Sequence, residues 1–207
     1  MKQAVFLDKD GTLIEDVPYN CDGRLIRLMP GVGDGLRRLQ AAGYTLIVVS
    51  NQPGVAHGFF STDALGQVET TLGAILEGER VRLDGFYYCP HHPEGRVPAY
   101  ATACDCRKPS PGLLIQAASD YAIELHASWM IGDILHDVEA GRRAGCRTIL
   151  IDNGHETEWH LGAYRCPDAT AADLASAADI ILAQESGTAI LKMDGMMARS
   201  HRASYEC

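Results

Sequence analysis

Asp8 and Asp10 stand one residue apart, directly after an apolar run at residues 4–7 and before Gly11 and Thr12. This order predicts a buried strand that ends in a sharp turn. Because side chains alternate along an extended backbone, we expect both carboxylates on one side, close enough to share a divalent cation. One could attack a phosphorus atom while the other handles the proton of the leaving group. The alternative is an acidic turn in which Asp and Gly serve turn geometry alone.

A second polar cluster, Ser50, Asn51 and Gln52, follows an apolar run at residues 44–49. A hydroxyl and an amide at the carboxyl end of a parallel strand can donate hydrogen bonds to a phosphoryl oxygen. The same residue types also build helix caps and turns, so an ordinary turn is an equal alternative for this segment taken alone.

Asp133 ends a third apolar run, at residues 129–133. Opposite Asp8, its carboxylate would complete an oxygen-rich site of the kind that Mg²⁺ takes. Asp137 falls in the first turn of the helix that should follow, where the helix dipole favours an acid. We therefore interpret Asp137 as a helix N-terminal charge.

Lys108 lies between Arg107 and Pro109, just before a predicted helix. The chain has a net charge of −9 and an isoelectric point near 5.3, which argues against a nucleic-acid-binding surface. An acidic protein that handles phosphate esters must supply positive charge locally. Lys108 is the natural counter-charge for a phosphate and for Asp8.

Three cysteines and a histidine form a separate unit in the stretch 89–106: Cys89, His91, Cys104 and Cys106. Two close-spaced pairs of such ligands match a closed, tetrahedral zinc site, which would fix this loop and the adjacent Arg107 and Lys108. His92 is an alternative to His91 as the nitrogen ligand. The other interpretation is a set of unrelated free or buried cysteines.

Apolar runs alternate with helical patterns along the 207 residues, which predicts an α/β protein with a mostly parallel sheet covered by helices on both faces. We expect one domain at residues 1–192 and a frayed tail at 193–207. The predicted strands are residues 4–7, 44–49, 86–88, 129–133, 147–151 and 179–182. The predicted helices are residues 30–43, 62–76, 111–121 and one from about 134 to 144.

The apolar run near the start is interrupted by acids, so we expect no secretory leader. No run approaches the roughly 18 apolar residues of a membrane span. We therefore expect a cytoplasmic protein without membrane or nucleic-acid partners, and a monomer.

The motifs together resemble a known family. The segments 8–12 and 50–52, Lys108, and the pair Gly132-Asp133 resemble, in order and spacing, the four motifs of the haloacid dehalogenase (HAD) superfamily of phosphohydrolases. The cysteine segments resemble its zinc-loop branch, which contains heptose bisphosphate phosphatases and histidinol-phosphate phosphatases. The similarity runs from about residue 5 to residue 151.

The resemblance implies a Mg²⁺-dependent phosphomonoesterase with a three-layer, Rossmann-like fold, a zinc-stabilised loop and no large cap domain. In this family pattern Asp8 is the nucleophile and Asp10 the general acid and base. Ser50 and Lys108 stabilise the phosphoryl group. Mg²⁺ is held by Asp8, Asp133 and the backbone carbonyl of Asp10. The residues that would contact the sugar phosphate substrate are Asp16, Tyr19, Asn51, Gln52 and Arg107.

Two positions depart from the pattern of the heptose enzymes. Ser50 stands where threonine is common, and Ile134 stands where a lysine that touches substrate is common. The zinc loop and Arg107 favour a heptose bisphosphate as substrate. Histidinol phosphate, or another small sugar phosphate, is the alternative within the class. A catalytically inert zinc-stabilised binding module is the alternative outside it. Such a relative would be expected to have lost one of Asp8, Asp10, Lys108 or Asp133, and all four are present.

Overall fold

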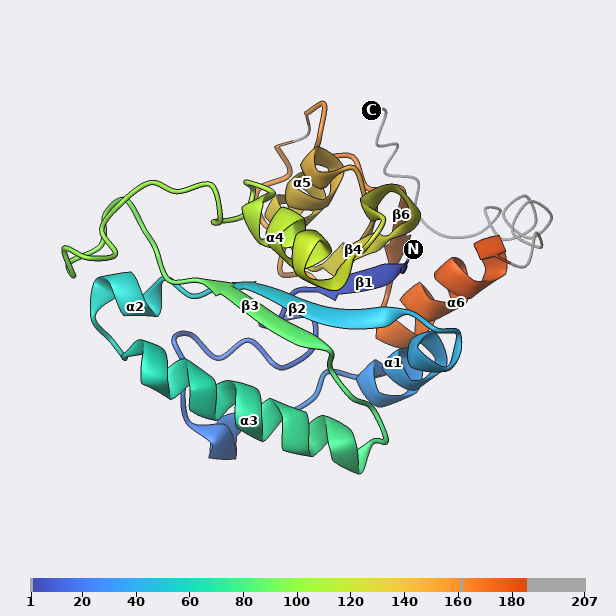
Figure 1. Ribbon diagram of the computed structural model, residues 1–207, viewed down its shortest axis with the longest axis horizontal. Helices are drawn as coiled ribbons and strands as arrows, with labels where there is room; N and C mark the ends of the chain where they lie inside the picture. The colour runs from blue at the N-terminus through green and yellow to red at the C-terminus, as the bar shows by residue number, and fades with distance from the viewer. Residues whose placement is uncertain (1, 161, 186–207) are drawn as a thin grey trace.

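The computed structural model describes residues 2–160 and 162–185. Within these residues, six parallel strands form one sheet in the order β3-β2-β1-β4-β5-β6 (Figure 1). The strands are β1 (Ala4–Leu7), β2 (Thr45–Asn51), β3 (Gly85–Cys89), β4 (Trp129–Gly132), β5 (Arg147–Ile151) and β6 (Ala169–Ala171). The helices are α1 (Val32–Ala41), α2 (Gly54–His57), α3 (Thr62–Gly78), α4 (Gly112–Tyr121), α5 (Leu135–Ala144) and α6 (Leu174–Glu185), with short 3₁₀ turns at Gly23–Leu25 and Leu125–Ala127.

The central strand β1 lies between β2 and β4, and all four of its side chains are buried. Leu7 is aligned with Val48 of β2 and with Ile131 of β4. Parallel strands in this register end at the same edge of the sheet. The residues that follow β1, β2 and β4 are therefore brought together.

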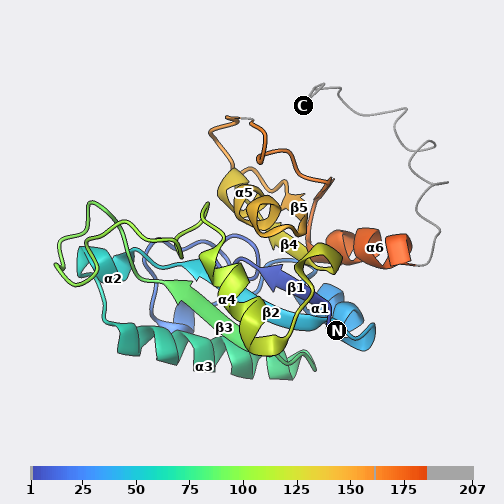
Figure 2. The same ribbon diagram turned by 45° about the horizontal axis from the view of Figure 1, so that its top comes forward.

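Helices cover both faces of the sheet, which is why its strands are apolar on both sides. Val5 and Leu7 of β1 face a core shared with α1, α3 and α6, whereas Ala4 and Phe6 face a core shared with α4. In the two views, α3 lies on one side of the sheet and α5 on the other (Figures 1 and 2). One parallel sheet with helices on both faces confirms the predicted three-layer fold. Among the described residues, the element order contains no inserted domain at the carboxyl edge of the strands.

The predicted strand at residues 179–182 is wrong, because this segment belongs to α6. A short apolar run cannot be told from a buried helical segment by its pattern alone. Leu174, Ala177, Ala178 and Ile181 are the buried residues of α6, and their spacing is helical. The sixth strand is the short β6, beside β5, which carries too few apolar residues to be recognised.

The other predicted elements agree with the structure to within a few residues at their ends, and the short α2 is an addition. The proposed domain boundary at residue 192 and the tail at 193–207 lie outside the described residues. In the part of the chain that is described, none of the helices combines the length and the apolar character needed to cross a membrane.

Candidate active site

Asp8 and Lys108 form the centre of the polar cluster at the carboxyl edge of the sheet. Lys108 Nζ lies 2.5 Å from Asp8 Oδ1 and 2.6 Å from Asp137 Oδ1, and it donates a third contact, at 2.9 Å, to the carbonyl of Val49. Lys108 is 3% exposed and Asp137 is completely buried. A single buried ammonium thus bridges two buried carboxylates.

The charges of this cluster do not balance. Burial raises the pKa of Asp8 to about 7, although the Lys108 ammonium lowers it. Burial also raises the pKa of Asp133, to about 6, and the neighbouring Asp8 carboxylate adds to this effect. Burial alone would lower the pKa of Lys108, but Asp137 and Asp8 together hold it above its usual range. Three buried carboxylates, Asp8, Asp133 and Asp137, lie in one cluster with a single ammonium, which pairs with two of them, so the site favours a further cation.

Asp133 is held from two sides. Its Oδ1 accepts a hydrogen bond from Thr12 Oγ1 at 3.1 Å, and its Oδ2 lies 2.7 Å from Nδ1 of His155. Gly11, with a φ of +82°, leaves the space for these groups, since a Cβ there would lie 2.0 Å from Asp133 Oδ2 and 2.6 Å from His155 Nδ1. Only glycine fits this turn, both for its backbone conformation and for its lack of a side chain.

Asp10 has contacts different from those of the other acids, although it lines the same cavity as Asp8 and Asp133. Its Oδ1 lies 2.5 Å from Nζ of the buried Lys9, and its Oδ2 accepts a hydrogen bond from Gln52 Nε2 at 2.9 Å. The same Gln52 amide donates to Ser50 Oγ at 2.8 Å. Gln52 therefore links the carboxylate of Asp10 to the hydroxyl at the end of β2.

Asn51 fixes the backbone of Lys108. Its Nδ2 donates to the carbonyl oxygen of Lys108 and its Oδ1 accepts from the Lys108 N–H, both at 3.0 Å. This pair of bonds ties the segment before α4 to the end of β2, so that the ammonium can reach Asp8.

Two cavities open beside these groups. One has a volume of about 220 Å³. Its lining consists of Asp8, Asp10, Lys108 and Asp133, together with Asp16, Asn51, Ile134 and His155. The other, of about 300 Å³, is lined by Asp10, residues 16–20 and residues 51–54. Asp16, Tyr19, Asn51 and Gln52, predicted as substrate contacts, all line one or both. Arg107 lines neither cavity, and its buried Nη1 has no hydrogen-bond partner within the described residues.

The acids that could hold a metal ion are Asp8, Asp133 and Asp137, whose ligand atoms lie within 4.8 Å of one another. Hard carboxylate oxygens with an unbalanced negative charge suit Mg²⁺. Asp8 and Asp10 line the same cavity, as the prediction of carboxylates on one side requires, but the Asp10 carboxylate is not among these three clustered ligands. The chain leaves the extended conformation after Leu7 and turns at Gly11, so strand alternation no longer applies at Asp10.

Asp137 has a larger role than a helix N-terminal charge. Its Oδ2 accepts a long hydrogen bond, 3.4 Å, from the N–H of Ile134, as a residue in the first turn of α5 can, but its other oxygen pairs with Lys108. In the sequence, the available signal for this second role was that Asp137 lies four residues after Asp133, which follows the end of a strand.

Asn153 and His155 were missed by sequence reasoning, and Thr12 was included in the segment 8–12 without a role of its own. Asn153 Nδ2 donates to the carbonyl of Gly11 at 2.7 Å, and the N–H of His155 donates to Asn153 Oδ1 at 3.2 Å. Both residues follow β5, at the same edge of the sheet as Asp133. Polar residues directly after a buried strand were therefore the available signal here too.

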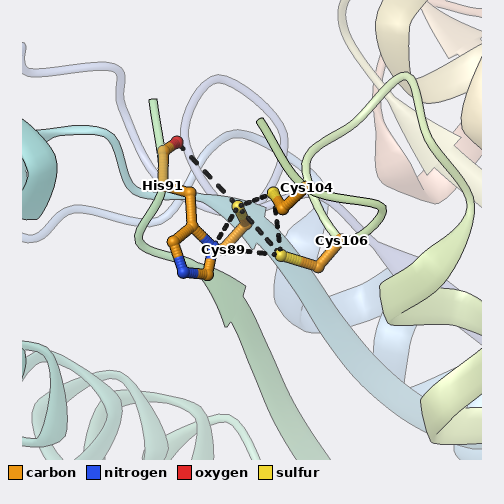
Figure 3. Close-up of side chains that lie close together, drawn as sticks. All are labelled: Cys89, His91, Cys104 and Cys106. Carbon is orange, nitrogen blue, oxygen red and sulfur yellow. Dashed lines mark hydrogen bonds between the residues drawn. The ribbon is translucent and has the colours of Figure 1, made fainter. Parts of the chain in front are cut away.

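Cys89, His91, Cys104 and Cys106 form the second group that could hold a metal ion (Figure 3). The sulfur of Cys106 lies 3.2 Å from those of Cys89 and Cys104 and 3.4 Å from His91 Nδ1. Neighbouring ligands of a tetrahedral site with Zn–S bonds of about 2.3 Å are roughly 3.7 Å apart, so the group fits zinc. Burial raises the pKa of the Cys89 thiol, so a bound cation would be needed to stabilise the thiolate at neutral pH.

His91, and not His92, belongs to this group. Figure 3 shows the ring of His91 turned toward the three sulfur atoms. His92 instead accepts a hydrogen bond from the N–H of Glu94 at 3.2 Å and packs on the ring of His57, with centroids 4.8 Å apart.

Comparison with protein families gives the class first. A family model described as HAD-hydrolase-like matches residues 105–177. A putative HAD-like phosphatase from Mesorhizobium loti is similar to this chain with a TM-score of 0.78 and 32% identity, covering 89% of this chain and 87% of that one. The fold is that of the HAD-like hydrolases.

Named relatives narrow the class. The chain is 43% identical over 155 residues to D-glycero-beta-D-manno-heptose-1,7-bisphosphate 7-phosphatase of Pasteurella multocida, covering 74% of this chain and 84% of that protein. It is 40% identical over 152 residues to the Escherichia coli K12 enzyme of the same name, covering 73% and 80%. The D,D-heptose 1,7-bisphosphate phosphatase of B. bronchiseptica, complexed with magnesium and phosphate, is similar with a TM-score of 0.76 and 29% identity, covering 89% and 99%. The chain belongs to the family of these phosphatases.

Proposed function

We propose that this protein is a Mg²⁺-dependent phosphomonoesterase that removes the 7-phosphate of D-glycero-β-D-manno-heptose 1,7-bisphosphate, in nucleotide-activated heptose biosynthesis. One observation carries the proposal: the buried group of Asp8, Lys108, Asp133 and Asp137 lies beside Asp10 in a chain 38% to 44% identical to phosphatases of that name. The names of these relatives support the β anomer, which the sequence alone leaves open.

Asp8 is the nucleophile. Its free carboxylate oxygen attacks phosphorus, the bond to the sugar oxygen breaks, and an aspartyl-phosphate forms. Asp10 gives its proton to the leaving alkoxide, then takes a proton from the water that hydrolyses the aspartyl-phosphate. Gln52 holds the Asp10 carboxylate in place for both steps.

Positive charge and hydrogen-bond donors stabilise the transferring phosphoryl group. Lys108 already lies 2.5 Å from the attacking carboxylate, and Asp137 and Asn51 fix its position. Ser50, next to β1 at the end of β2, supplies the hydroxyl.

Mg²⁺ would be held by Asp8, Asp133 and the backbone carbonyl of Asp10. When bound, it supplies the positive charge that the three buried carboxylates lack and neutralises phosphoryl oxygens. Asp137 pairs with Lys108 and is the third acidic residue of the site.

The sugar is recognised by Asp16, Tyr19, Asn51 and Gln52, which line the cavities, and by Arg107, whose Nη1 has no partner among the described residues. Ile134 lines the smaller cavity beside Asp133 and carries no charge toward the substrate. This position is the specific reason to include other sugar phosphates, and histidinol phosphate, in an assay.

Zinc is the ion that the group of Cys89, His91, Cys104 and Cys106 fits, and we assign it a structural role in the loop 89–106. A closed set of four protein ligands leaves no position for substrate. We also propose a single domain over residues 1–192 that acts as a monomer in the cytoplasm, where a reducing environment keeps thiolate ligands available.

The test is phosphate release in Mg²⁺ from both anomers of heptose 1,7-bisphosphate, with histidinol phosphate alongside and Asp8→Asn as the blank. Selective turnover of the β anomer supports the proposal. A preference for histidinol phosphate would show that this compound, and not the heptose bisphosphate, is the substrate. No turnover of any sugar phosphate would support an inert binding module.

A further inference from the structure

The backbone carbonyl of Asp10 lies between two carbonyls that are hydrogen-bonded. The one before it, of Lys9, accepts two backbone N–H groups at 3.0 Å, and the one after it, of Gly11, accepts a hydrogen bond from Asn153 Nδ2 at 2.7 Å. In the part of the chain that the structure describes, no hydrogen-bond donor reaches the carbonyl oxygen of Asp10. A free carbonyl oxygen beside a cluster of carboxylates is the type of ligand that suits Mg²⁺.

The direction of this carbonyl depends on Gly11. The peptide unit that joins Asp10 to Gly11 is planar, and its C=O and N–H groups point in opposite directions. The N–H of Gly11 donates to the carbonyl of Ile14 at 2.8 Å, so the oxygen of Asp10 points away from Ile14. Gly11 has a φ of +82° and no side chain, which leaves its backbone freer to rotate than that of any other residue type. A second restraint, on the carbonyl of Gly11, limits this rotation.

Asn153, in the segment that follows β5, provides this second restraint. Its Nδ2 donates to the carbonyl of Gly11, and its Oδ1 accepts a hydrogen bond from the N–H of His155 at 3.2 Å, so both ends of the amide are engaged. The ring of His155 in turn contacts Asp133, at 2.7 Å. The turn after β1 and the carboxylate after β4 are thus held by neighbouring residues of one short segment.

This segment, residues 152–156, is anchored at both of its ends. The N–H of Asp152 donates to the carbonyl of Ala171 in β6 at 2.9 Å. Glu156 Oε2 accepts a hydrogen bond from the N–H of Leu135, the first residue of α5, at 2.6 Å. A carboxylate at the N-terminus of a helix is favoured by the helix dipole. The position of Asn153 is therefore set by the fold before any ligand arrives.

We propose that Asn153 is a positioning residue for the metal site, which holds the carbonyl of Gly11 and thereby keeps the carbonyl of Asp10 in the orientation of a Mg²⁺ ligand. This inference rests on the proposed function, because it takes that carbonyl, Asp8 and Asp133 as the ligands. Groups that orient metal ligands commonly change the metal affinity by about tenfold or more. Asn153 acts through the backbone, so its loss should affect the metal and not the recognition of the sugar.

The first test measures metal binding without turnover. Mn²⁺ takes the same oxygen ligands as Mg²⁺ and can be followed by electron paramagnetic resonance. In the zinc-loaded protein, Mn²⁺ binding should be about tenfold weaker in Asn153→Ala than in the wild type. The double variant Asp8→Asn with Asp133→Asn measures Mn²⁺ bound at other positions. Equal affinity in Asn153→Ala and the wild type would overturn the inference. A wild type that binds no more Mn²⁺ than the double variant would instead overturn the metal assignment of the proposed function.

A second variant, Asn153→Asp, separates the hydrogen bond from the effect of charge. The carboxylate keeps the shape of the side chain and an acceptor for the N–H of His155, but it has no donor for the carbonyl of Gly11 at neutral pH. Mn²⁺ binding should therefore weaken in this variant too, although an added negative charge by itself attracts a cation. Tighter binding in Asn153→Asp would overturn the inference.

Ser128→Ala is the matched control, at the start of β1. The buried Ser128 Oγ accepts a hydrogen bond from the N–H of Ala4 at 3.0 Å and donates to the carbonyl of Glu124 at 2.7 Å. Its loss should lower the melting temperature and leave the Mn²⁺ affinity unchanged. An equal loss of Mn²⁺ affinity in this control would show a general effect of lower stability and would overturn the inference.

The last test uses turnover of whichever sugar phosphate the wild type hydrolyses. In Asn153→Ala, the Mg²⁺ concentration for half-maximal activity should rise about tenfold, and saturating Mg²⁺ should restore kcat. The KM of the sugar phosphate at saturating Mg²⁺ should equal that of the wild type. A raised KM, or a kcat that stays low at saturating Mg²⁺, would contradict a role confined to the metal.

Discussion

At the scale of single residues, the site depends on how Lys108 is shared. The ammonium contacts Asp8 and Asp137 at almost equal distances, so removing one carboxylate leaves the other pairing intact. An unpaired buried charge is costly, and this second partner avoids it. Asp8 can therefore be replaced by a neutral residue while the Lys108 ammonium stays paired with Asp137.

Asp8→Asn should therefore abolish turnover, by about a thousandfold or more, and leave the melting temperature of the metal-free protein equal or higher. The amide cannot attack phosphorus. The substitution also removes a buried carboxyl group, whose pKa is raised by burial to about 7. Phosphate release measures the loss of turnover, and thermal melting followed by circular dichroism measures the melting temperature. Residual turnover close to that of the wild type would show that another residue is the nucleophile.

His155→Ala should raise the Mg²⁺ concentration needed for half-maximal activity by about tenfold, with kcat at saturating Mg²⁺ reduced less. The imidazole contacts one oxygen of Asp133 and orients a carboxylate that we assign to the metal. Titration with Mg²⁺ measures this. His126→Ala, at an exposed position in the turn Leu125–Ala127, is the control, and an unchanged Mg²⁺ requirement in His155→Ala would contradict the role.

Residue identities were the most predictable part of the site. Asp8, Ser50 and Asp133 could be placed together because each ends or follows an apolar run, and the register of β1, β2 and β4 does bring them together. The direction of the Asp10 carboxylate and the burial of Asp137 could not, because both depend on turns beyond the strand ends. Contacts across more than a hundred residues, such as Asn153 with Gly11, leave no local pattern.

At the scale of elements, the loop 89–106 carries the clearest dependence on a metal. Cys104→Ser should lower the melting temperature by several degrees and reduce turnover only indirectly, since the four ligands lie apart from the reacting carboxylates. A chelator selective for zinc, with Mg²⁺ in excess, should have the same effect on the wild type. Cys21→Ser, in a different loop, is the matched control. A protein that contains no zinc and melts unchanged with chelator would contradict the assignment.

Helices and strands were predictable where the apolar pattern was long enough, or the flanking turn residues clear enough, to distinguish one from the other. The 17 residues of α3 carry their buried side chains at helical spacing over several turns, which a strand does not satisfy. The short β1 was predicted correctly because turn residues follow it directly. The segment of α6 was misassigned because four residues of a helix can be as apolar as a strand. Its true partner is α1, where a Cβ at Gly35 would lie 2.5 Å from the carbonyl of Leu174, and this close approach has no signature in the sequence of α6 itself.

At the scale of the whole molecule, protons and Mg²⁺ should compete for the same carboxylates. The pKa of Asp8 is about 7 in the folded protein against 3.8 for a free side chain, and that of Asp133 is about 6. Folding without metal therefore favours the protonated acids, and their contribution to stability is lost as the pH rises from about 4 through 7. Mg²⁺ replaces those protons and should restore stability at high pH.

The increase in melting temperature caused by Mg²⁺ should thus be larger at pH 8 than at pH 5. Thermal melting at both values, with and without Mg²⁺, measures it. Asp133→Asn should show a smaller increase at pH 8 than the wild type. An equal increase at both pH values would show that these carboxylates do not bind the ion.

The strand order has a consequence for synthesis of the chain. β1 pairs with β2 early, but its other neighbour is β4, which begins only at Trp129. Until that segment leaves the ribosome, the most apolar strand presents one open edge, a surface that attracts other chains. A nascent or truncated protein that ends before residue 129 would be at risk of aggregation. It would also lack Asp133 and Asp137, so a partial chain that ends before residue 129 should be inactive.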